Sequence, residues 1–241
     1  MAGSSVSSNE YWAFDNGCIS CLPLRDMGVE FRISLRARGN MRDARIARDF
    51  AGYFAPDRSL ILAEQVHGNR IELLAGDAKA IVPECDGFLV PHSIRLAAGI
   101  RSADCLAICL CDSGSRDAAL VHSGWRGSRA GIAERALAML MDRGALVRNI
   151  HAAFSPSIQA CCYAVGSEFR DYFPEEYIHT RGEQLFFDNQ GYARAACLRF
   201  GLLPEHIYSS PYCTACNSEL FYSYRREGQE AGRILSITYS L

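Results

Sequence analysis

The stretch CLAICLCDSGSRDAALVHSGWRG, residues 105–127, carries most of the fold prediction. Residues 105–111 form a continuous apolar run typical of a buried strand, and residues 112–114 (Asp-Ser-Gly) predict the turn that ends it. Residues 118–121 predict a second strand, which ends at His122. A helix is expected next, because six apolar residues share one face at helical spacing. They are Ile132, Ala133, Ala136, Leu137, Leu140 and Met141, with Ser128 as the expected N-cap and Gly144 as the expected end.

Short strands outnumber helices in the rest of the chain. Further strands are expected at residues 60–66, 70–74, 87–90, 96–100, 149–154, 207–210, 220–224 and 234–239, and further helices at residues 165–172 and 187–200. Residues 32–49 carry many charges of both signs and predict a solvated, partly helical stretch. Because several strands follow one another directly, we predict an α+β fold with mixed β-sheets flanked by helices, not regular βαβ winding.

The composition is that of an ordinary globular protein. The 241 residues are 49% hydrophobic and 22% charged, which excludes a disordered chain, and a formal net charge of −2 argues against a nucleic-acid or membrane-surface binder. The densest apolar run has seven residues, far below the roughly 18 needed to span a bilayer. Residues 1–10 are Ser-rich and unlike a signal peptide. We therefore expect a disordered tail at 1–10, a single domain at 11–241, a cytoplasmic location, and a monomer or weak homodimer.

Eleven cysteines are a high count for a chain of this length, and without an export signal the thiols should be reduced. Two Cys-x-x-Cys pairs occur, Cys18 with Cys21 and Cys213 with Cys216. Together they form a candidate four-thiolate zinc site, but separate, packed thiols are the preferred interpretation. The adjacent Cys161 and Cys162 are predicted to be core residues.

Three side chains suited to metal binding stand at the ends of predicted apolar strands: His67, Cys105 and His122. Imidazole and thiolate are the ligands that zinc prefers, and a catalytic zinc ion takes three protein ligands with one position open. The alternative is that the histidines are surface or capping residues and the cysteine a core residue. Next to His122, Gly124 permits close approach of a ligand and Arg126 offers a guanidinium for an anion.

A second chemistry uses the same atoms. Cys105 would be a nucleophile and His122 its base, with Asp104 or another acceptor orienting the imidazole. The sequence alone does not separate a thiolate held by a protonated histidine from one held by a metal ion.

Several motifs occur in a recognisable order along residues 30–241. They are Gln65-Val66-His67-Gly68, Ser102-Ala103-Asp104-Cys105, the segment 122–127 (HSGWRG), Pro156-Ser157-Ile158, the segment 161–166 (CCYAVG), the segment 221–226 (FYSYRR) and Gly232-Arg233. Together they resemble the YfiH-like family, also called the laccase-domain, polyphenol-oxidase-type or peptidoglycan-editing-factor family. The resemblance implies a single layered α/β/β/α domain and metal ligation by His67, Cys105 and His122.

The resemblance also implies zinc-dependent chemistry on purine nucleosides: phosphorolysis of adenosine, inosine and methylthioadenosine, and deamination of adenosine. Phosphorolysis needs an arginine to hold phosphate. Arg126 is the first choice, with Arg36 and Arg225 behind it, and Tyr163 is a candidate to stack on the base. The expected partners are thus a purine nucleoside and phosphate.

Three other functions stay open. They are a cysteine hydrolase or amidase acting on a peptidoglycan precursor, a copper-dependent phenol oxidoreductase, and a weakly active metal protein that binds a partner. Six histidines are few for a multicopper oxidase. The chain also departs from the family pattern, with Phe154-Ser155 in place of Ile-Gly, Ala164 in place of Glu, and residues 35–40 (LRARGN) keeping only the Arg and one Gly. These changes bear on substrate preference more than on metal binding.

Overall fold

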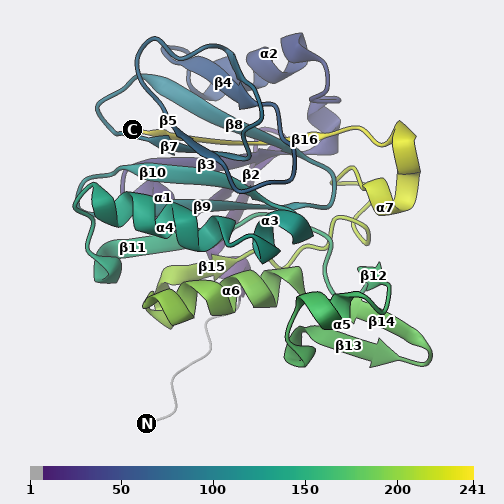
Figure 1. Cartoon of the computed structure of the whole chain (residues 1–241). Coiled ribbons are helices and arrows are strands. Elements are labelled where there is room, and N and C mark those ends of the chain that lie inside the picture. The colour runs from purple at the N-terminus through teal and green to yellow at the C-terminus, as the bar shows by residue number, and fades with distance from the viewer. Residues whose placement is uncertain (1–7) are drawn as a thin grey trace.

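Two β-sheets packed face to face form the centre of the computed structural model, which describes residues 8–241 (Figure 1). The first sheet has the strand order β1 (Trp12–Asp15), β2 (Cys18–Cys21), β3 (Val29–Ser34), β16 (Ile234–Ser240), β8 (Leu96–Ser102), β4 (Ser59–Ala63) and β6 (Ile81–Val82). The second has the order β15 (Ile207–Ser209), β11 (Ile150–Phe154), β9 (Leu106–Asp112), β10 (Ala118–Ser123), β7 (Gly87–Val90) and β5 (Ile71–Leu73). Both contain parallel and antiparallel pairs, which confirms the predicted α+β class with mixed sheets.

Helices cover the outer faces of the two sheets. Helices α4 (Ile132–Asp142) and α6 (Asn189–Phe200) lie on the six-stranded sheet, and α2 (Ala44–Phe54) lies on the seven-stranded one (Figure 1). Phe31, Phe88 and Ile100 are fully buried between the sheets. The order of layers is therefore helix, sheet, sheet, helix, and the apolar surface buried between layers supplies the main stabilising free energy. Among the described helices, none has the length and apolar character to cross a bilayer.

The helix expected after residues 105–127 is confirmed, with two local corrections. Five of its six predicted apolar residues are buried, whereas Met141 is 42% exposed. Ser128 is not the N-cap, because the chain first forms a separate short helix, α3 (Trp125–Arg129), and α4 begins after Gly131 at φ 72°. Gly144, at φ 98°, follows the helix end as expected.

Two other predictions need correction. The helical part of residues 32–49 is confirmed by α2, but the beginning of this range is not solvated. The chain passes from α1 (Leu22–Asp26) into the buried strand β3, where Arg32 forms an ion pair with Glu30 at 2.9 Å. Residues 220–224 form no strand. Ser223 instead caps α7 (Tyr224–Glu227), with its hydroxyl accepting a hydrogen bond from the backbone of Arg226.

A small third sheet projects from one corner of the molecule (Figure 1). It contains β12 (Ala164–Val165), β14 (Gln184–Phe187) and β13 (Ile178–Arg181), and it packs with α5 (Phe169–Tyr172), which is all that forms of the helix expected at 165–172. Tyr172 stacks on Trp125 of α3 at 5.6 Å, so this corner adjoins the segment that follows His122. Of the expected tail, residues 1–7 lie outside the described residues, and Ser8–Tyr11 form a 3₁₀ helix.

Candidate metal centre and cavity

The structure brings His67, Cys105 and His122 together. Cys105 immediately precedes β9 and His122 lies near the end of β10, and these strands pair antiparallel, so the start of one meets the end of the other. His67 comes from the loop after β4. One potential ligand atom of each residue lies within 4.8 Å of the others, and the two imidazole rings are 4.8 Å apart at 77°. Three residues that are far apart in the sequence therefore form a compact set of two nitrogen ligands and one sulfur ligand.

Asp86, which sequence reasoning missed, organises this set from behind. Its fully buried carboxylate lies 2.9 Å from Nδ1 of His122 and accepts hydrogen bonds from the backbone amides of Val66, His67 and Gly68. When Nδ1–H donates to Asp86, Nε2 of His122 is left free to bind a metal ion. The three hydrogen bonds from these amides also stabilise the left-handed backbone conformation of His67, at φ 62°.

The electrostatics of the set favour a thiolate. Burial alone would raise the pKa of the Cys105 thiol, but the adjacent His122 and His67 imidazoles lower it to about 6. Burial alone would lower the pKa of His122, but Cys105 and Asp86 raise it to about 9. Cys105 and His122 therefore form a thiolate–imidazolium pair, and the same thiolate is the form that binds a metal ion.

Gly124 keeps the space beside these three side chains open. A Cβ at this position would lie 3.1 Å from the Cys105 sulfur, 3.3 Å from Cδ2 of His67 and 3.6 Å from Cε1 of His122. An N, N, S set suits zinc or copper, and three protein ligands leave one position for a small molecule. The residues present thus fit the metal that the motifs imply.

The set opens into a cavity of about 670 Å³, a size typical of small-molecule sites. Four arginines line it: Arg42, Arg101, Arg225 and Arg233. The lining residues also include Glu64 and Asp104 as the carboxylates. The arginine side chains differ in their partners. Within the described residues, the buried Nε of Arg101 has no hydrogen-bond partner, and burial lowers the pKa of this guanidinium. An anion beside Arg101 would offset that cost of burial.

Two of the four predicted substrate residues line the cavity and two do not. Tyr163 and Arg225 are part of its wall, with the guanidinium 5.6 Å from the ring centre. Arg126 is exposed and lies over the Trp125 ring, outside the cavity. Arg36 pairs with Glu227 and stacks on a neighbouring tyrosine. Neither Arg126 nor Arg36 lines the cavity in this structure, so the structure does not support their assignment to phosphate binding.

Asp104 has a structural role. At φ 86°, its carboxylate accepts hydrogen bonds from Oγ1 of Thr214 at 2.6 Å, Oγ of Ser223 at 3.0 Å and the backbone amide of Arg225 at 2.7 Å. It therefore anchors the C-terminal loops beside Cys105, while Asp86 is the residue that orients the imidazole. The only sequence signal for Asp86 is its position directly before a predicted strand. Arg101 carries no such signal, because it follows an apolar predicted strand as an ordinary charged residue would.

Comparisons with known proteins identify the family of the chain. The model of the family described as multi-copper polyphenol oxidoreductase laccase matches residues 40–240. A purine nucleoside phosphorylase of Mycobacterium tuberculosis is 32% identical over 197 residues, which covers 80% of this chain and 77% of that protein. An adenosine deaminase, RL5, from an unknown prokaryotic organism is 28% identical, covering 75% of this chain and 74% of its own.

Solved structures show the same fold. YlmD from Geobacillus stearothermophilus superposes with a TM-score of 0.85 at 24% identity, over 95% of this chain and 98% of that one. Bacillus licheniformis YfiH superposes with a TM-score of 0.87 at 20% identity, over 95% and 99% of the two chains. At these identities the likeness extends to the fold alone.

Proposed function

The chain belongs to the YfiH-type, laccase-like family, and from that premise we propose that it is a zinc-dependent purine nucleoside phosphorylase that also deaminates adenosine. The relatives named purine nucleoside phosphorylase and adenosine deaminase support an enzyme of this kind. The single observation that carries the proposal is one cavity that joins the His67, Cys105 and His122 set to an unpartnered arginine. The proposed substrates are adenosine, inosine and methylthioadenosine, with phosphate.

Arg101 is the group that we assign to phosphate. The fork of a guanidinium matches the oxygens of a phosphate ion, and Arg101 lines the cavity without a protein partner for its Nε among the described residues. Its backbone is fixed, because the side-chain amide of Gln65 donates to its carbonyl oxygen at 2.8 Å and accepts from its amide at 2.9 Å. Arg225, by contrast, already donates to the carbonyl oxygens of Cys162 and Ala164. This difference supports Arg101 as the clamp and Arg225 as a part of the wall.

The rest of the cavity supplies the remaining roles. Tyr163 offers an aromatic face to the purine, and its contacts with Phe169 and Phe187 fix the ring. During phosphorolysis a phosphate oxygen bonds to C1′ of the sugar as the bond from C1′ to the base breaks. The base keeps the electron pair and needs a proton, which we assign to Glu64, because protein groups already occupy the Asp104 carboxylate.

His67, Cys105 and His122 would hold the zinc ion, with Asp86 fixing the tautomer of His122. When bound, zinc supplies Lewis acidity at this end of the cavity and lowers the pKa of water near it. Deamination adds water at C6 of adenosine and releases the amino group as ammonia, and we assign this reaction to the same end of the cavity.

A cysteine hydrolase is the second candidate, and one observation favours it. Cys105, His122 and Asp86 form a thiolate, imidazolium and carboxylate series in which each member contacts the next. A peptidoglycan precursor is the substrate that we would test. Copper-dependent phenol oxidation is less well supported, because the second potential metal cluster in the described part of the chain contains no histidine.

Substitution of His67 separates the candidates. His67→Ala should abolish metal binding at the His67, Cys105 and His122 set, and with it the release of purine bases, if the chain is a metal-dependent nucleoside enzyme. A cysteine hydrolase should keep its activity in His67→Ala and lose it in Cys105→Ala. His179→Ala, an exposed histidine on β13, is the matched control and should behave as the wild type. Purine release by folded His67→Ala at the wild-type rate would refute the proposal.

A further inference from the structure

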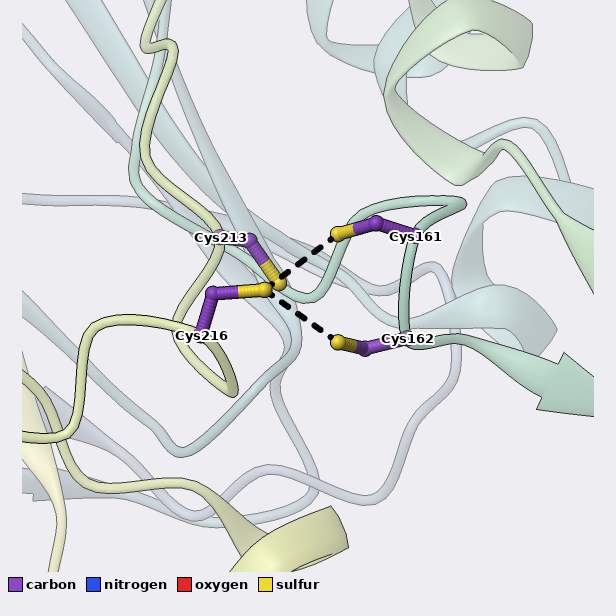
Figure 2. A group of neighbouring side chains, drawn as sticks. All are labelled: Cys161, Cys162, Cys213 and Cys216. Atoms are coloured by element: carbon purple, nitrogen blue, oxygen red, sulfur yellow. Dashed lines mark hydrogen bonds between the residues drawn. The ribbon is translucent and has the colours of Figure 1, made fainter.

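A second group of metal-capable side chains lies outside the cavity. Two loops bring Cys161, Cys162, Cys213 and Cys216 together, and their side chains point toward one another (Figure 2). The Cys216 sulfur lies 3.5 Å from that of Cys161 and 3.3 Å from that of Cys162, and all four sulfurs lie within 4.8 Å of one another. The sequence prediction is corrected in two respects. Cys213 and Cys216 join the adjacent pair and not the Cys18 pair, and neither Cys161, which is exposed, nor Cys162, which is partly buried, is a core residue.

The spacing of the four sulfurs fits one tetrahedral ion. A zinc–sulfur bond of about 2.3 Å places the sulfurs of a regular tetrahedron about 3.8 Å apart. The observed contacts of 3.3 and 3.5 Å and the 4.8 Å limit lie on either side of that value. Four thiolates around a single ion are typical of structural zinc, because no coordination position stays open for chemistry.

Backbone contacts hold the two loops in place. Ser157 and Cys213 form a parallel bridge, and the Thr214 amide donates to the Ser157 carbonyl oxygen at 3.0 Å. The backbone amide of Gln159 points at the Cys213 sulfur, 3.5 Å away. Amide donors directed at a sulfur stabilise its thiolate form, so the loops present a preformed site.

Positive charge surrounds the group. Arg181 donates to the carbonyl oxygen of Cys161 at 3.4 Å, and Arg225 donates to that of Cys162 at 3.3 Å. Arg226 donates to the carbonyl oxygens of Thr214 and Ala215, between the other two cysteines. Four thiolates around a divalent cation carry a net charge of about −2, which these guanidinium groups offset.

We propose that Cys161, Cys162, Cys213 and Cys216 bind a structural zinc ion, distinct from the metal centre in the cavity. Binding requires each thiol to release its proton to solvent. The ion would join the loop that leads into Tyr163 to the loop whose Thr214 hydroxyl bonds to Asp104, next to Cys105. The site thus braces one wall of the cavity without contributing an open coordination position. The proposal does not depend on which reaction the cavity carries out.

Metal content of the full-length protein tests the proposal. Protein purified with zinc under reducing conditions should contain two zinc ions per chain by mass spectrometry of its metals. Cys216→Ser should contain one, while Cys18→Ser, a buried cysteine of the other Cys-x-x-Cys pair, should keep two. Cobalt-substituted wild type should show thiolate-to-cobalt charge-transfer absorption that Cys216→Ser loses in large part.

Several results would overturn the proposal. They are a zinc count that is the same in the wild type and in Cys216→Ser, iron in place of zinc among the four cysteines, or a disulfide among the four cysteines in freshly reduced protein. If Cys216→Ser fails to fold, the same measurement is made on Cys161→Ser, which removes another exposed ligand. Thiol titration of the wild type is an independent test of the site. Removing zinc should expose these four thiols to the reagent, and equal reactivity with and without zinc would contradict the site.

Discussion

Replacing Asp86 with asparagine should weaken metal binding while leaving all three ligands in place. One carboxylate oxygen faces Nδ1 of His122 and the amide of His67, both at 2.9 Å, and the other accepts from the amides of Val66 at 3.2 Å and Gly68 at 2.7 Å. An asparagine keeps only one acceptor oxygen. Its NH₂ group must therefore face either the imidazole and one amide, or two amides.

The size of the effect follows from those four contacts. Loss of a carboxylate behind a metal-binding histidine typically costs about 10- to 100-fold in metal affinity, or roughly 1.4 to 2.7 kcal/mol. Asparagine leaves one or two of these amides without an acceptor, at about 1–3 kcal/mol each, so the free energy of unfolding should fall by ~1–6 kcal/mol. Both effects are expected, because Asp86 orients His122 and fixes the 66–68 loop.

Competition with a chelator of known affinity measures the first effect, and denaturant unfolding of the zinc-free protein measures the second. Asp117→Asn is the matched control. Asp117 is also buried, and it accepts hydrogen bonds from the His92 amide and from Arg143 away from the metal ligands. It should lose stability without losing metal affinity. Wild-type zinc affinity in folded Asp86→Asn would refute the role assigned to this carboxylate.

Three further predictions concern the metal centre, the fold and pH. Gly124→Ala should weaken zinc binding, because its methyl group meets the Cys105 sulfur at 3.1 Å. An overpacking cost of about 1–3 kcal/mol corresponds to a rise in the zinc Kd of roughly 5- to 150-fold. Unchanged affinity in a calorimetric titration would contradict this. Leu137→Ala, at a fully buried position in α4, should lower the free energy of unfolding by about 2–5 kcal/mol in a urea titration, and a loss below 1 kcal/mol would count against the packing described. Burial, with His206 stacked 3.7 Å away, lowers the pKa of His151 to about 4. The unfolded chain then binds more protons than the native chain as the pH drops from about 6.5 to about 4. The free energy of unfolding should therefore fall over that range, by up to about 3 kcal/mol at this residue. His151→Gln should flatten this pH dependence, and an equally steep dependence in the variant would refute the assignment.

The sequence indicated the three candidate metal ligands by their position at apolar strands, and the family resemblance then implied that they bind a metal ion. His67, Cys105 and His122 each interrupt or border an apolar strand, and a polar side chain at such a place needs a partner. The helix after His122 was predictable for the same reason, since its apolar spacing has the period of a helix.

Other features depend on contacts between distant segments. β3 was missed because Glu30 and Arg32 look solvated in the sequence, yet they neutralise each other inside the sheet. Cys161 was assigned to the core because cysteine is usually buried, whereas its partners lie in a loop near residue 213. Arg126 follows His122 in the sequence, but the start of α3 directs it outward over Trp125.

Product analysis tests the central claim most directly. Folded, zinc-loaded protein is incubated with adenosine and phosphate, with a chelator, and with zinc added back after the chelator. The account predicts adenine with ribose 1-phosphate, or inosine from deamination, lost with the chelator and restored by zinc. No purine product from the zinc-loaded protein, or equal product in the presence of the chelator, would contradict it.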